Sequence, residues 1–77
     1  MVEAWVLIQA EVGMAAAVGR AVAAIEGVSS ADVVTGPYDV IARAKTANID
    51  ALGRLVVSKI HVVKGVTRTL TCPVLRL

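Results

Sequence analysis

The sequence predicts an α+β fold of ferredoxin-like βαββαβ order, in which two helices cover one face of a four-stranded antiparallel sheet. Short apolar runs alternate with two segments of helical periodicity, in the order strand, helix, strand, strand, helix, strand. Each helical segment ends at a Gly-Val step, at residues 27–28 and 65–66. Right-handed crossovers then place both helices on the same face of the sheet. With 77 residues, the chain forms one domain, 1–77.

The first half begins with a strand and a helix. Residues 4–10 are a continuous, partly β-branched apolar run, which is typical of a strand buried on both faces. A helix follows from Gly13, because its apolar residues recur at helical spacing and many alanines surround them. The residues of this stripe are Met14, Val18, Ala21, Val22 and Ile25. Gly27 lies where a left-handed C-terminal cap ends the helix.

A hairpin joins the two halves of the chain. Residues 28–35 form a weaker, more polar run that indicates an edge strand. Residues 36–39, Gly-Pro-Tyr-Asp, are a cluster of turn formers. The apolar run 40–44 is the antiparallel partner of the strand before the turn.

The second helix begins after Asn48, a plausible N-cap, and ends at Gly65. Its stripe is Ile49, Leu52, Val56, Ile60 and Val63. Residues 66–72 alternate as a last strand with three threonines on one face, and Pro73 limits this strand to a sheet edge or a bulge.

Composition indicates self-association. The hydrophobic fraction is 57% and the mean hydropathy is +0.76, yet no apolar run reaches the roughly 18 residues of a spanning helix. The start of the chain lacks a basic region typical of signal peptides, so we expect a cytoplasmic protein without membrane contact. The first strand is apolar on both sides, with Trp5, Leu7 and Gln9 on one of them. Because the helices cover one face, we expect the other to pack on a second copy, as a dimeric α+β barrel.

The charge pattern argues against nucleic-acid binding. The net charge is +2, but the eight basic residues are dispersed and the aromatic residues are only Trp5 and Tyr38. Enzyme motifs are also absent: there is no phosphate loop, nucleophile motif or acid/base pair. We expect His61 to be a surface side chain and Cys72 a small buried hydrophobe, with no metal and no cofactor.

One turn residue admits two interpretations. Asp39 follows Gly36-Pro37-Tyr38 at the mouth of the hairpin, where backbone groups freed from the sheet can meet a polar ligand. The alternative, at least as well supported by the residues alone, is that Asp39 closes an Asx turn.

The run Val33-Val34-Thr35-Gly36-Pro37-Tyr38-Asp39-Val40, the two Gly-Val steps and Gly65-Val66-Thr67-Arg68-Thr69 resemble the effector-binding domain of the Lrp/AsnC regulators. The resemblance covers essentially the whole chain. It implies this fold, pairing through the sheets, rings of dimers, and amino-acid effectors held between dimers. It also implies a set of ligand-site residues: Gly36, Tyr38 and Asp39 in the turn, and Thr69 and Thr71 on the last strand.

Full regulators of this family carry a helix-turn-helix before the domain, and here the first strand begins by Ala4. The chain therefore looks like a stand-alone effector domain, which can act alone or in mixed oligomers with full-length regulators. Two other functions fit the fold: a small dimeric α+β-barrel enzyme such as a cofactor-independent monooxygenase, and a purely structural oligomerisation module.

Overall fold

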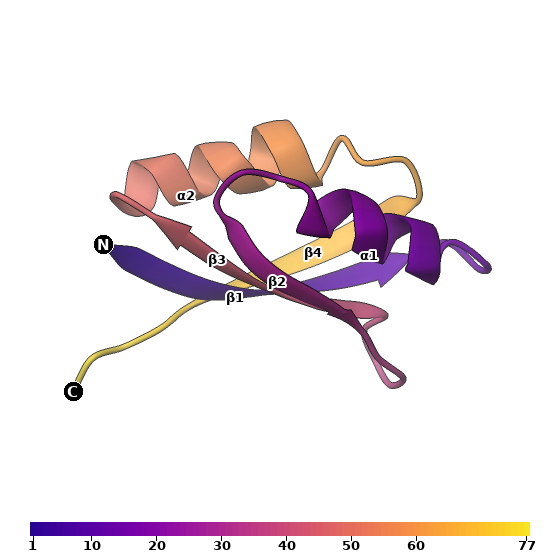
Figure 1. The fold of residues 1–77 in the computed structure, drawn as a ribbon. Helices are drawn as coiled ribbons and strands as arrows, with labels where there is room; N and C mark the ends of the chain where they lie inside the picture. The colour runs from indigo at the N-terminus through magenta and orange to yellow at the C-terminus, as the bar shows by residue number, and fades with distance from the viewer.

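The computed structural model describes all residues, 1–77, and confirms the predicted element order. The strands are β1 (Val2–Ala10), β2 (Val28–Val33), β3 (Val40–Thr46) and β4 (Val66–Pro73). The helices are α1 (Ala15–Ala23) and α2 (Ile49–Leu55), and α2 continues as a π-helical turn, η1 (Val56–Ile60). Figure 1 shows both helices on the same side of the sheet, as predicted.

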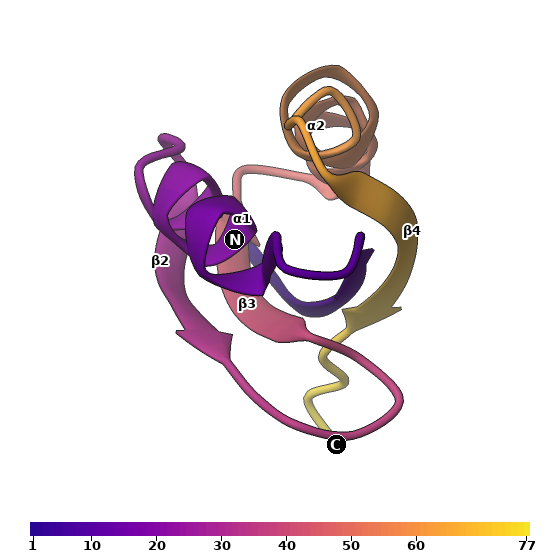
Figure 2. The same ribbon diagram turned by 90° about the vertical axis from the view of Figure 1, so that its right-hand side faces the viewer.

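The sheet has the order β2-β3-β1-β4, and every neighbouring pair is antiparallel. The two strands expected at the edges, β2 and β4, are the edges. β1 is central, so that Val6 pairs with Ala42 of β3 on one side and with Thr71 of β4 on the other. Viewed along the sheet, the strands curl around the side that carries the helices (Figure 2).

The core lies between the helices and this curled face. Its members are Ala4, Val6, Ile8, Val18, Val22, Val40, Ala42, Ala44, Leu52, Leu55, Val56 and Ile60. No polar or charged residue is buried. The even-numbered residues of β1 therefore face the helices, and the odd-numbered ones lie on the uncovered face, which we call the open face.

The strand boundaries differ from the prediction by about two residues. β1 starts at Val2 and β3 runs on to Thr46, because these two end residues pair with each other. β2 stops at Val33, two residues short, since the chain already leaves the sheet there for the turn. The strand boundaries are determined by the hydrogen-bond register between neighbouring strands, and this register cannot be read from residue types.

Two stripe assignments in the helices were wrong. α1 ends at Ala23, before Gly27, and Ala21 is exposed. In the second helix Ile49 is 57% exposed, whereas Leu55, outside the predicted stripe, is buried. Leu55 lies three residues after the buried Leu52 and so shares its face of α2, a position that the predicted stripe left out.

The N-cap of the second helix agrees with the sequence: Asn48 Oδ1 accepts a hydrogen bond from the Ala51 amide at 2.8 Å. The predicted end at Gly65 was wrong, because the helix ends at Ile60 and a turn follows it. Gly65 lies at the end of this turn with a positive φ of 98°, which a side chain would strain. A Cβ atom there would also lie 3.0 Å from Met14, so the chain turns into β4 directly against α1.

Neither helix reaches the length and continuous apolar character that a membrane-spanning helix requires.

Candidate functional site

The turn between β2 and β3, residues 34–39, lies beside the end of β1. Its base is closed by a hydrogen bond from the Val34 amide to the Asp39 carbonyl at 2.9 Å. Gly36, at the tip, has a φ of 138°, and no atom lies within 4 Å of the position its Cβ would take. Tyr38 is half-buried. The turn therefore projects from the sheet, with its tip open to solvent.

Asp39 joins this turn to β1. Its amide donates to the Ile8 carbonyl at 2.9 Å, and its Oδ2 accepts from the Ala10 amide at 2.8 Å. The carboxylate does not close an Asx turn on its own segment, because its partner lies 29 residues away. Oδ1 accepts no hydrogen bond within the chain. Asp39 thus has a structural role and also retains an oxygen that can bind a ligand.

The amides near the tip are also free. Those of Thr35, Gly36 and Tyr38 donate no hydrogen bond within the chain. Free amides in successive turn residues can receive an anion such as a carboxylate. The turn therefore offers donors at its tip and an anionic acceptor at its base.

The two β4 threonines lie elsewhere. Thr69 and Thr71 are opposite Ile8 and Val6, on the helix-covered side of the sheet and at its edge. Thr69 Oγ1 lies 2.5 Å from Nε2 of His61, at hydrogen-bond distance. A half-open hollow of about 310 Å³, which we call the β4 hollow, lies at this contact and is lined by His61, Val66, Thr67, Arg68 and Thr69. Thr71 does not line it.

His61 was expected to be an ordinary surface side chain. It is exposed, but its contact with Thr69 makes it part of the β4 hollow. The sequence held a signal for this contact: Gly65 reverses the chain between His61 and the threonine strand, which brings residues eight apart together.

Within one chain, the predicted ligand residues form two groups. β1 lies between β3, which continues the turn, and β4, which carries Thr69 and Thr71. The end of β1 nevertheless forms hydrogen bonds to both sides. On the turn side the Ala10 amide donates to Asp39 Oδ2 at 2.8 Å, and on the β4 side Thr67 Oγ1 donates to the Gln9 carbonyl at 3.2 Å. A ligand that contacts both groups directly needs a second chain or a bridge over β1.

The open face combines apolar and charged residues. Leu7 is half-buried and pairs with Leu70 of β4 and Ile41 of β3. Leu70 is 47% exposed. Trp5 is 41% exposed. Cys72, expected to be buried, is exposed beside Trp5, because β4 turns this residue away from the helices. In the single chain, β1 is therefore buried on one face only. The second face, which was also predicted to be buried, becomes buried only when another chain covers it.

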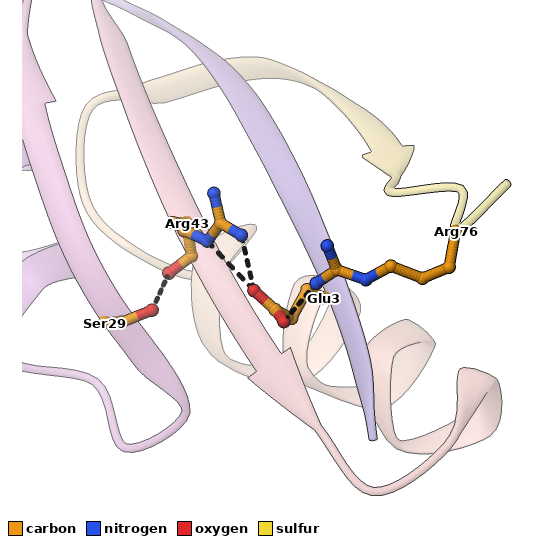
Figure 3. A network of polar contacts seen from close by, with 4 residues as sticks. All are labelled: Glu3, Ser29, Arg43 and Arg76. Carbon is orange, nitrogen blue, oxygen red and sulfur yellow. Dashed lines mark hydrogen bonds and ion pairs between the residues drawn. The ribbon is translucent and has the colours of Figure 1, made fainter.

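A charged network borders this apolar area. Glu3 Oε1 accepts hydrogen bonds from Nη2 and Nε of Arg43 at 2.5 and 3.1 Å, and Oε2 accepts from Arg76 Nη2 at 2.5 Å (Figure 3). The Arg43 guanidinium also lies 4.8 Å from the centre of the Trp5 ring. Hydrogen bonding from Arg43, helped by the positive charges of Arg43 and Arg76, holds the pKa of Glu3 below its ordinary value, although desolvation opposes the shift.

No group of three or more His, Cys, Asp or Glu side chains is placed to hold a metal ion. The aromatic and imidazole side chains do not converge either. Trp5 lies on the open face, Tyr38 in the turn and His61 in the β4 hollow.

The architecture defines the class of protein: a ferredoxin-like α+β domain with a polar turn at one end of its sheet. Residues 3–77 match the family described as the Lrp/AsnC ligand binding domain. The chain therefore belongs to the Lrp/AsnC ligand-binding domain family.

Similar proteins agree with this assignment. An uncharacterised HTH-type transcriptional regulator of Pyrococcus furiosus is 33% identical over 54 residues, which are 70% of this chain and 36% of that regulator. The match thus spans about a third of the length of this curated relative. A crystal structure from Thermus thermophilus has a TM-score of 0.93 at 34% identity, and the alignment covers 100% of this chain and 96% of that one.

A transcriptional regulator of Neisseria meningitidis, solved in complex with L-Met, shares the fold. Its TM-score is 0.84 at 19% identity, and the alignment covers 97% of this chain and 50% of the regulator.

Proposed function

We propose that this domain is a regulatory module that binds an amino acid at the turn of Gly36, Tyr38 and Asp39, without catalysing a reaction. The observation that carries the proposal is the pairing, in one turn, of free amides at the tip with a free carboxylate oxygen at the base. An α-amino acid carries the complementary charges, a carboxylate for the amides and an ammonium for Asp39 Oδ1. The L-Met complex of the structurally similar regulator is consistent with this ligand class.

The β4 hollow is the second element of the proposed site. Thr69 and His61 provide polar groups beside Val66, and Thr71 lies further along the same strand face. Because β1 separates this hollow from the turn of the same chain, the two can contribute to one site if neighbouring dimers bring the turn of one chain to β4 of another. A ring of dimers provides this arrangement.

Dimerisation through the open face is part of the proposal. The occupant we assign is a second copy of this chain, because Leu7, Ile41 and Leu70 form an apolar centre while the Glu3 charge beside it is already neutralised by two arginines. A second copy can cover this face without burying an unpaired carboxylate. The same face can pair with the equivalent domain of a longer regulator, which would form mixed oligomers.

The structure favours binding over the enzyme alternative. A cofactor-independent monooxygenase of this fold needs a polar, aromatic-lined cavity between helices and sheet. Here the core on that side is apolar, and the β4 hollow at its edge has no Trp or Tyr in its lining. Amino-acid binding also distinguishes the proposed function from that of a purely structural oligomerisation module, which would bind no amino acid.

The test is a thermal-shift screen with the individual amino acids, followed by calorimetry with each one that stabilises the protein. Saturable binding that is weakened by Asp39→Asn supports the proposal. Absence of binding by any amino acid contradicts it and favours the oligomerisation module.

A further inference from the structure

Gln9 links the open face to the turn. By strand alternation its side chain lies on the open face with Trp5 and Leu7, while its neighbour Ile8 is buried under the helices. From this face the side-chain amide, Nε2, donates a hydrogen bond to the carbonyl of Pro37 at 2.9 Å. A residue of the open sheet face thus holds the tip of a turn 28 residues away.

This is the one hydrogen bond within the chain that reaches residues 35–38. The bonds of Asp39 and Val34 fasten the base of the turn, and none of them involves the tip. Packing adds little to these bonds, since the space beside Gly36 is empty, residues 35–37 are exposed and only Tyr38 is half-buried. The conformation of the tip therefore depends on Gln9 to an unusual degree.

We propose that Gln9 is a positioning residue for the ligand turn and that it makes the order of the turn depend on coverage of the open face by a second copy. This inference rests on the proposed function. In a single chain the Gln9 bond is exposed, and water competes for both of its partners. When a second copy covers the open face, water is excluded, the bond strengthens and the rotamer of Gln9 is restricted.

An ordered tip is the better receptor. A ligand that meets a mobile tip must order it on binding, and that entropy cost reduces affinity. In the dimer the amides of Gly36 and Tyr38 are already in place. The dimer is therefore the form that binds the amino acid tightly, although Gln9 itself does not contact the ligand.

The test compares Gln9→Met with Val57→Met. Methionine has nearly the length of glutamine but cannot donate to Pro37. Val57→Met introduces the same side chain at an exposed position on the helical side, away from both the open face and the turn. Backbone ¹⁵N relaxation at concentrations where the wild type is dimeric measures the order of each amide. We expect the order parameters of Gly36 and Tyr38 to fall in Gln9→Met toward about 0.6, while that of Val40 stays near the rigid value of about 0.85.

Affinity is the second readout. In Gln9→Met, calorimetry with the amino acid identified for the wild type should show a loss of about 2- to 12-fold, which corresponds to one neutral hydrogen bond. The dimer constant, measured by sedimentation, should not change in either variant. Val57→Met should retain wild-type order and affinity.

A monomeric variant tests the coupling separately. Leu7→Glu leaves Gln9 in place, and its monomer should have a tip as mobile as that of Gln9→Met. A tip that stays ordered in this monomer, or in Gln9→Met, overturns the inference. If the wild type binds no amino acid, the proposed function fails, whereas the order parameters still decide whether Gln9 positions the turn.

Discussion

The carboxylate of Asp39 accepts a hydrogen bond from the backbone amide of Ala10 at 2.8 Å, across 29 residues of sequence. Together with the bond from the Asp39 amide to the Ile8 carbonyl, it attaches the β2–β3 turn to the end of the central strand. Asp39 therefore stabilises the attachment of the turn to β1 and, through its other carboxylate oxygen, is a candidate ligand-binding residue. Substitutions at this position have to separate these two roles.

Asp39→Asn should separate them. Asparagine keeps an oxygen that can accept from Ala10 but loses the charge, so we expect the free energy of unfolding to change by less than about 1 kcal/mol. Amino-acid affinity should fall about 10- to 150-fold, the equivalent of the roughly 1.5 to 3 kcal/mol of a hydrogen bond to a charged group. Calorimetry measures the affinity and urea unfolding the stability. Asp32→Asn, on exposed β2, is the matched control, and equal affinities of Asp39→Asn and wild type would rule out the ligand role.

Leu7→Glu should give a monomer or an aggregate. Its side chain lies at the centre of the open face, and a dimer would bury the new carboxylate without a partner. Light scattering at low micromolar concentration measures the mass. Val57→Glu introduces the same charge on the helical side, where the residue is 61% exposed, and should leave the dimer intact. A wild type with the mass of one chain would refute the predicted dimer.

Glu3 should make stability depend on acid pH. Its folded-state pKa lies below its ordinary value of 4.5, so ionised Glu3 stabilises the fold above that pH. This contribution should decline as pH falls below 4.5 and vanish below the lowered pKa. The Glu3→Gln variant lacks this stabilisation at every pH because glutamine does not ionise. The difference in urea midpoint between wild type and variant should therefore be largest near neutral pH and shrink in acid. A difference independent of pH would show that the ion pairs do not stabilise the fold.

Two glycines should respond to alanine in opposite directions. Gly65 has a φ of 98° and a Cβ there would lie 3.0 Å from Met14, so Gly65→Ala should destabilise the protein by more than about 1 kcal/mol. Gly53 lies inside α2 with open space around it, and Gly53→Ala should stabilise by about 0.5 to 1 kcal/mol through helix propensity. Urea unfolding of both variants checks this pair, and the account of Gly65 is wrong if both shift stability in the same direction.

The fold could be predicted because its signals are local. Asn48 caps a helix, Gly27 and Gly65 adopt a positive φ where the chain turns into β2 and β4, and the alternation along β1 separates Val6 and Ile8 from Trp5 and Leu7. The details that could not be predicted depend on tertiary contacts.

The burial of Leu55 depends on how the second helix packs on the sheet, and the exposure of Cys72 depends on the face of β4 on which it lies.

The candidate site was predictable only in part. The sequence pointed to the turn through its turn-forming residues and its resemblance to a known family, but not to the partners that hold it. Ala10 contributes a backbone amide, which is independent of residue type, and Gln9 is an ordinary polar residue until the fold places it beside Pro37. His61 joins Thr69 only after the chain has turned at Gly65.

Amino-acid binding by the wild-type protein is the central claim, and a thermal-shift screen tests it most directly. At 100 times its dissociation constant a ligand adds about 2.7 kcal/mol of stability, which in a domain of this size raises the melting temperature by roughly 10 to 20 °C. We predict such a rise for at least one amino acid, with saturation, and a smaller rise in Asp39→Asn. No rise with any of the amino acids at millimolar concentration would contradict the proposed function.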